Sequence, residues 1–170
     1  MHSARASRAD RVVGVLAVLA LVAGTVIIGT QRARYERFLY ISELGAVYMR
    51  SEEWFRWGFV LVIVGIALVA WVVRDVRSRG RVLDRWRPAL SLLLSAGWFL
   101  VASQVNCTDG CPAPFTRDST PRDAVHIVAA VLGFAAGAWA MLQLATAADR
   151  WMRRISAVGG VLVAGIAATG

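Results

Sequence analysis

The chain has 170 residues, 58% of them hydrophobic, and the hydrophobic residues are gathered into five long blocks. A helix needs about 20 apolar residues to cross a hydrocarbon core about 30 Å thick, so these blocks exclude an ordinary soluble domain and predict a membrane protein. The net charge of +8 comes from nineteen arginines that lie almost entirely between the blocks. Because that distribution is typical of membrane topology, no nucleic acid is expected as a partner.

The predicted fold is all-α, a polytopic bundle of transmembrane helices that forms a single membrane domain over residues 1–170. The five expected spans cover residues 12–30, 57–73, 88–105, 124–148 and 155–170. The first is longer than the apolar core of a signal peptide, and no small-residue cleavage site follows it, so we expect it to stay in the protein. The fifth is marginal in length.

The segment between the first two spans, residues 31–56, mixes charged and aromatic residues, which favours a loop with an interfacial aromatic belt. Within it, the run ISELGA from Ile41 to Ala46 predicts a short helix followed by a turn. Ser42 is suited to cap that helix, and Gly45 is suited to the turn.

The second span ends in residues 74–87, which contain six arginines, and Pro88 then opens the third span, as proline often opens a helix. Small and polar side chains share one face of this span, and we expect that face to turn towards other helices. We expect its serines to bond main-chain carbonyls, with a catalytic role for either serine as the lesser alternative. The face comprises Ser91, Ser95, Trp98 and Ala102.

The distribution of arginine predicts the orientation. If the N-terminus is cytoplasmic, the inner segments 1–11, 74–87 and 149–154 hold twelve arginines, and the outer segments 31–56 and 106–123 hold seven. The positive-inside rule therefore predicts a multi-pass protein of the cell inner (plasma) membrane with its N-terminus in the cytoplasm. The segment 106–123 would then be an extracytoplasmic loop.

Both cysteines, Cys107 and Cys111, lie in this loop, and an oxidising exterior makes a short disulfide the simplest interpretation, with Gly110 and Pro112 providing the turn. Two alternatives stay open. A metal site could use both cysteines with Asp109 and His126, but this pattern matches no structural zinc spacing. A redox pair would normally have two residues between the cysteines rather than three. No metal and no cofactor are expected.

His126 shares a helix face with Gly133 and Gly137, so it is expected to point into helix packing rather than lipid. An inward ionisable group in a membrane protein is a candidate functional residue. One of three aspartates, Asp109, Asp118 or Asp123, could orient the ring and raise its basicity. Alternatively, the ring bonds a loop carbonyl and holds the loop onto the helix.

Three features together resemble the bacterial membrane family catalogued as domain of unknown function 998. They are the Ser-x-x-Gly segment at Ser42 and Gly45, the Asp-Gly-Cys-Pro segment that begins at Asp109, and His126 at the start of the fourth span. The family is similar in layout to the six-span Frag1, DRAM and Sfk1 group. The resemblance covers nearly the whole chain and implies six helices with cytoplasmic termini, so the sixth helix is expected to be missing or truncated here. It implies special roles for Ser42, Gly45, Asp109 and His126, but no established reaction.

A more distant similarity is to membrane hydrolases that include the alkaline ceramidases. It implies that Ser103, Asp109 and His126 act around a zinc ion, although the other histidines of that scheme are absent.

The first hypothesis is a non-enzymatic membrane protein whose outer cap, held by the Cys107–Cys111 bridge and by His126, binds membrane lipids or another membrane protein. Ser42, Gly45, Asp109 and His126 are its expected binding residues. The alternative is a membrane-embedded hydrolase or other lipid-modifying enzyme. In it His126 is the general base, and Asp109 or Asp123 orients the ring. A thiol redox protein is the third hypothesis.

Overall fold

A computed structural model describes residues 7–37, 39–113 and 116–169, and in the last helix the side chains of residues 150 and 152–160. The described residues form helices and no strand, so the all-α fold is confirmed. Each of the five described α-helices overlaps one expected span. Residues 1–6 and 170, at the two ends of the predicted membrane domain, lie outside the described part of the chain. The elements are α1 (Arg8–Arg32), the 3-10 helix η1 (Ile41–Gly45), α2 (Glu52–Val72), α3 (Pro88–Gln104), α4 (Pro121–Ala145) and α5 (Arg150–Thr169).

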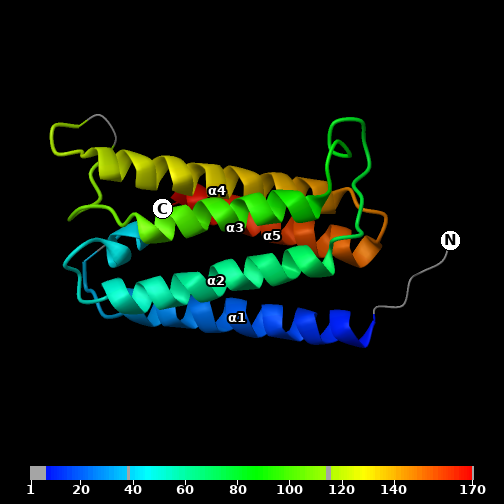
Figure 1. Ribbon diagram of the computed structural model, residues 1–170, viewed down its shortest axis with the longest axis horizontal. Coiled ribbons are helices and arrows are strands. Elements are labelled where there is room, and N and C mark those ends of the chain that lie inside the picture. The colour runs from blue at the N-terminus through cyan, green and yellow to red at the C-terminus, as the bar shows by residue number, and fades with distance from the viewer. Residues whose placement is uncertain (1–6, 38, 114–115, 170) are drawn as a thin grey trace.

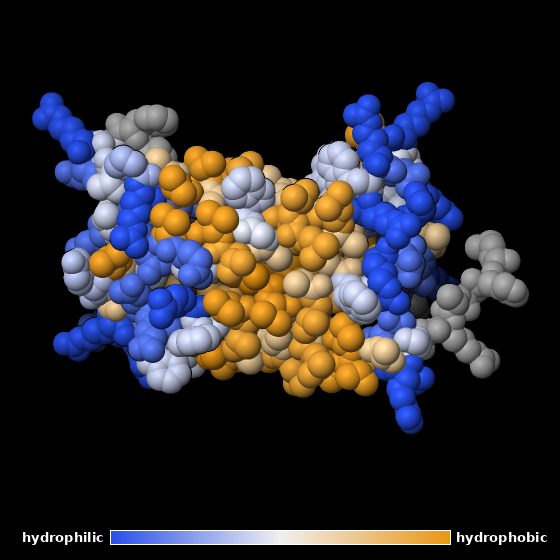
Figure 2. All heavy atoms as spheres, in the orientation of Figure 1, coloured by the Kyte–Doolittle hydropathy of each residue, from blue (hydrophilic) through white to orange (hydrophobic). Residues whose placement is uncertain are grey.

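The α-helices run alternately up and down, and each packs against its neighbour in the sequence (Figure 1). One end of the bundle, here called the cap end, carries the connections 33–51 and 105–120. The other, here called the loop end, carries the connections 73–87 and 146–149. Figure 2 shows a hydrophobic band between two hydrophilic ends. By length and composition, α1, α2 and α4 can each cross a membrane, while α3 is apolar but shorter. The protein is therefore a helical membrane protein.

Glycines hold α1 and α2 close together. A Cβ atom added to Gly24 would lie 2.5 Å from the carbonyl oxygen of Gly58, and one added to Gly65 would lie 2.6 Å from Cγ of Leu21. Real Cβ atoms do not approach other atoms so closely, so neither position accepts a side chain without a shift. Small residues at such contacts let helix backbones approach within a membrane.

The contact between α3 and α4 uses the face that the sequence indicated. Ser91, Ser95 and Ala102 are each about 1% exposed, and the Ser95 hydroxyl donates to the carbonyl of Gly133 over 2.8 Å. The expectation that these side chains face another helix is confirmed for three of the four residues. The fourth, Trp98, leaves 39% of its surface exposed, because its large ring at the edge of the stripe extends past the contact.

A buried amide at the loop end fixes the connection 73–87. The side chain of Gln143 on α4 is fully buried, and its Nε2 donates to the carbonyls of Leu83 (3.0 Å) and Trp86 (2.8 Å). Its Oε1 accepts from the hydroxyl of Ser91 (2.7 Å), which itself accepts from Nε1 of Trp86 (2.7 Å). Sequence analysis assigned no role to Gln143, and the bonds show that its role is to tie the connection to α3 and α4.

Candidate functional site

The cap end is built on η1, which lies against the first turn of α2. Leu44 is fully buried beside Phe55, and a Cβ atom added to Gly45 would lie 2.5 Å from Cδ1 of Phe55. The predicted short helix is present, but Ser42 does not cap it, because the helix begins at Ile41 and Ser42 already lies inside it. Instead the Glu43 carboxylate accepts the N–H of Tyr40 over 2.6 Å.

The turn after this helix also differs from expectation. Gly45 has an ordinary φ, and the left-handed residue is Tyr48, with φ 72°. Gly45 is therefore required by its close approach to Phe55 rather than by the turn.

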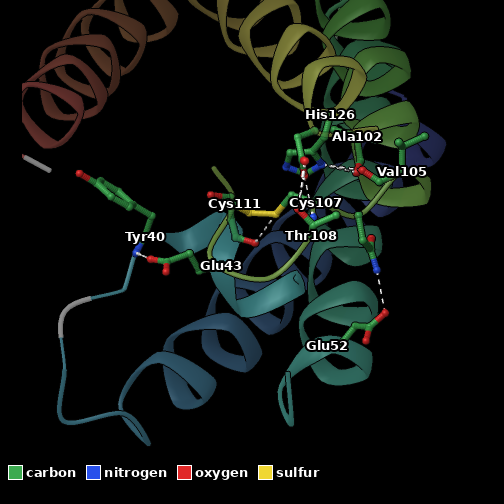
Figure 3. The surroundings of a disulfide bond; sticks show 12 residues. Tyr40, Glu43, Glu52, Ala102, Val105, Cys107, Thr108, Cys111 and His126 are labelled. Atoms are coloured by element: carbon green, nitrogen blue, oxygen red, sulfur yellow. Dashed lines mark hydrogen bonds between the residues drawn. A yellow bond between two sulfur atoms is a disulfide. The ribbon is translucent and has the colours of Figure 1, made fainter. Parts of the chain in front are cut away.

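The predicted disulfide joins Cys107 and Cys111, whose Cα atoms are 5.2 Å apart (Figure 3). The enclosed chain turns through two left-handed residues, Gly110 at φ 74° and Cys111 at φ 42°, so the expected glycine turn is present. Cys107 is fully buried, and its sulfur lies 3.8 Å from the carbonyl oxygen of Ser42. The N–H of Val47 donates to the carbonyl of Cys107 over 3.1 Å. The bridged turn is thus bound to the η1 segment.

Asp123 joins the bridged turn to α4. Its side chain is fully buried, and Oδ1 accepts the N–H of Thr108 over 2.7 Å. Oδ2 accepts the N–H and the hydroxyl of Thr120, at 2.8 and 2.6 Å, and the Thr108 hydroxyl also bonds both carboxylate oxygens. The Thr120 hydroxyl in turn accepts the N–H of Asp123, which completes a capping box at the start of α4.

His126 holds the end of α3. Its Nδ1 lies 3.0 Å from the carbonyl oxygen of Ala102 and 2.8 Å from that of Val105 (Figure 3). Because both partners are acceptors, Nδ1 must carry the proton. The ring therefore bonds the last carbonyls of α3, as in the alternative that gave it a holding role. Among the described residues no hydrogen bond joins it to an aspartate.

The two cap connections also meet through Glu52 at the start of α2. Its Oε1 accepts the side-chain amide of Asn106 over 2.9 Å, and its Oε2 accepts the N–H of Tyr48 over 3.2 Å. Asn106 lies between Val105, which His126 holds, and Cys107, which the disulfide holds. The position of Glu52 thus depends on both.

Beside Glu52 is a shallow open groove of about 320 Å³. Glu53, Arg50 and Arg56 are exposed, and among the described residues their side chains have no hydrogen bond or ion pair. The groove therefore offers both signs of charge to a ligand. Its lining residues are Met49, Arg50, Glu52, Glu53 and Arg56.

The structure brings most of the sequence-predicted site residues to the cap end. Their contacts there hold the cap connections against the helices. Asp109 is exposed on the bridged turn, and His126 bonds Ala102 and Val105 instead of it. Ser103 donates to the carbonyl of Leu100 in its own helix over 2.7 Å. The described residues contain no group of three histidines, cysteines or acidic residues placed to hold a metal ion.

Sequence analysis missed the roles of Glu52, Asn106 and Thr108. It also missed the capping box, which was readable as a threonine three residues before Asp123, ahead of an apolar run.

The apolar band, the up-and-down helices and the cap define a polytopic helical membrane protein with a disulfide-bridged cap. A family model matches residues 15–170, so the chain belongs to the family described as protein of unknown function DUF998. No curated protein and no solved structure matches the chain.

Proposed function

We propose that the protein is a non-enzymatic binding protein of the inner (plasma) membrane, whose cap lies outside and holds the headgroup of a membrane phospholipid in the groove beside Glu52, here called the headgroup groove. The observation that carries the proposal is the position of the groove along α2, beside exposed tryptophans. Trp54 and Trp57, each 56% exposed, lie on the same turns as the groove residues Glu53 and Arg56. Tryptophan favours the membrane interface, so the groove opens at headgroup level.

The chemistry of the groove suits a zwitterionic headgroup. Arg50 and Arg56 can form charge-assisted hydrogen bonds with a phosphate, and Glu53 can accept hydrogen bonds from a primary ammonium group. Phosphatidylethanolamine presents both groups. Phosphatidylcholine has the phosphate but no N–H to donate, so the groove should distinguish the two.

The rest of the cap supports this function by holding the groove in shape. Glu52 forms one wall and is fixed by Asn106, whose neighbours are held by His126 and by the Cys107–Cys111 bridge. A site held ready in the free protein loses less freedom on binding. His126 and the disulfide are therefore positioning residues in this proposal rather than contacts to the lipid.

The test compares the association of spin-labelled phosphatidylethanolamine and phosphatidylcholine with the protein in reconstituted membranes. The wild type should prefer phosphatidylethanolamine, and E53Q should remove the preference, because the amide has no charge to attract the ammonium group. R50Q/R56Q should weaken both lipids. The control R37Q/R117Q removes two exposed arginines elsewhere at the cap end and should change neither. A preference that survives E53Q and R50Q/R56Q would rule the groove out.

A second candidate, a partner membrane protein, is favoured by Tyr48. Its side chain is 94% exposed although its φ is 72°, a conformation that non-glycine residues rarely adopt and that is often found at functional sites. A photo-crosslinking amino acid at Tyr48 would form a protein adduct if this candidate is right and a lipid adduct if the groove proposal is right. The same group at Trp71, exposed near the loop end, should form lipid adducts in both cases.

The hydrolase and thiol-redox hypotheses have no comparable support. The hydrolase hypothesis gives Asp109 or Asp123 the role of orienting His126, whereas the carboxylate of Asp123 is occupied by Thr108 and Thr120. The two cysteines are bridged, with Cys107 fully buried.

A further inference from the structure

The net charge of the protein is concentrated at the loop end. The cap-end segments 31–56 and 106–123 contain seven arginines and seven acidic residues. The segments 1–11, 74–87 and 149–154 contain twelve arginines and only four acidic residues, which accounts for the whole net charge of +8. Apart from residues 1–6, which are not described, the structure places these three segments at the loop end.

Ion pairs divide the six arginines of the connection 73–87 into two groups. Arg74 pairs with Asp10 at 2.8 Å, and Arg74 and Arg87 both lie near Asp75, while Arg77 lies 3.9 Å from Asp84. These contacts take up every acidic residue of the connection. The side chains of the other three arginines are exposed and have no ion pair among the described residues: Arg79, Arg81 and Arg85.

Apolar side chains are exposed beside these three arginines in the sequence. Val82 is 60% exposed and Trp86 is 42% exposed. The backbone here is well anchored, because Gln143 bonds the carbonyls of Leu83 and Trp86, and the N–H of Arg79 donates to the hydroxyl of Thr146 over 3.3 Å. A fixed connection thus presents basic and apolar side chains together.

The connection 73–87 extends sideways from the helix bundle. In Figure 1 the connection between α2 and α3 projects beyond the edge of α4, across the helix axes rather than only along them. Figure 2 shows hydrophilic side chains projecting from the same corner, next to the hydrophobic band. Since the helices cross the membrane, a segment that extends across their axes runs along the membrane surface. Its side chains can therefore reach headgroups beside the protein.

We propose that Arg79, Arg81 and Arg85, with Val82 and Trp86 beside them, form a docking surface for anionic phospholipids of the leaflet at the loop end. The arginines bind headgroup phosphates, and the apolar pair enters the boundary between headgroups and chains. Exposed arginines on the first turns of α5, Arg150 and Arg153, add the same sign of charge at this end. The surface is distinct from the headgroup groove, and it requires only that the helices cross a membrane.

The test measures spin-labelled phosphatidylglycerol against spin-labelled phosphatidylcholine around the full-length protein, reconstituted in phosphatidylcholine at low salt. The wild type should prefer the anionic lipid. R79Q/R81Q/R85Q should lose most of the preference, because it removes the three exposed cations that attract the anionic headgroup. The lysine triple variant R79K/R81K/R85K keeps the charge and should keep most of it.

The control R37Q/R117Q/R122Q removes three exposed arginines at the cap end, which the described residues leave without an ion pair. It should retain the wild-type preference. An equal loss of the preference for phosphatidylglycerol in R79Q/R81Q/R85Q and in R37Q/R117Q/R122Q would overturn the proposal, because the preference would then follow net charge alone. A preference that survives R79Q/R81Q/R85Q, or one that raised salt does not weaken, would overturn it as well.

Discussion

Asp123 provides the sharpest test of how the cap is held. Its buried carboxylate accepts the main-chain N–H and the hydroxyl of both Thr108 and Thr120. In Asp123→Ala all four donors lose this acceptor. A hydrogen bond to a charged group contributes about 1.5–3 kcal/mol, so the loss of the two amide bonds alone predicts about 4 kcal/mol of destabilisation.

The assay is thermal unfolding of the purified protein in detergent, followed by tryptophan fluorescence. For a domain of this size, 1 kcal/mol shifts the midpoint by about 2–4 °C, so Asp123→Ala should unfold roughly 8–16 °C below the wild type. Asp118→Ala is the matched control, because Asp118 is exposed and should change stability by less than about 0.5 kcal/mol. A midpoint for Asp123→Ala within 2 °C of the wild type would refute the structural role of this carboxylate.

Three further predictions use the same assay. Gly45→Ala should destabilise by about 1–3 kcal/mol because its Cβ would overlap Phe55, whereas Gly97→Ala, with open space around it, should be neutral or stabilising; equal effects would contradict the packing argument. Gln143→Leu should cost about 2 kcal/mol by leaving buried polar partners without bonds, and an unchanged midpoint would show that the amide contributes little. His126→Ala should cost about 1 kcal/mol and speed amide exchange in residues 105–111, and unchanged exchange there would count against its holding role.

The helices were predictable because apolar blocks of membrane length leave the chain few alternatives. Their starts were less predictable. α4 begins at Pro121 rather than residue 124, since Thr120 and Asp123 cap it and so bring charged residues into the first turn. α1 begins at Arg8 for a similar reason, through the capping box of Ser7 and Asp10. Charged residues before the apolar blocks were interpreted as parts of loops, whereas Asp10 and Asp123 lie in the first turns of helices and cap them.

The candidate site was predictable only in part. The disulfide followed from two cysteines near a glycine turn, and the inward direction of His126 followed from its helix face. Its partners did not, because the three candidate aspartates lie nearer to His126 in the sequence than Ala102 and Val105, whose carbonyls are 24 and 21 residues away. The contacts of Glu52 with Asn106, 54 residues apart, carry no sequence pattern.

The central claim is a bridged cap on the outer side of the membrane, and labelling of Cys107 and Cys111 in intact cells tests it most directly. The reagent is a membrane-impermeant maleimide, applied with and without prior reduction. Labelling only after reduction is the predicted result, because the thiols are joined in a disulfide and the cap is proposed to lie outside. Labelling without reduction would contradict the bridge, and labelling that requires detergent to open the membrane would contradict the orientation.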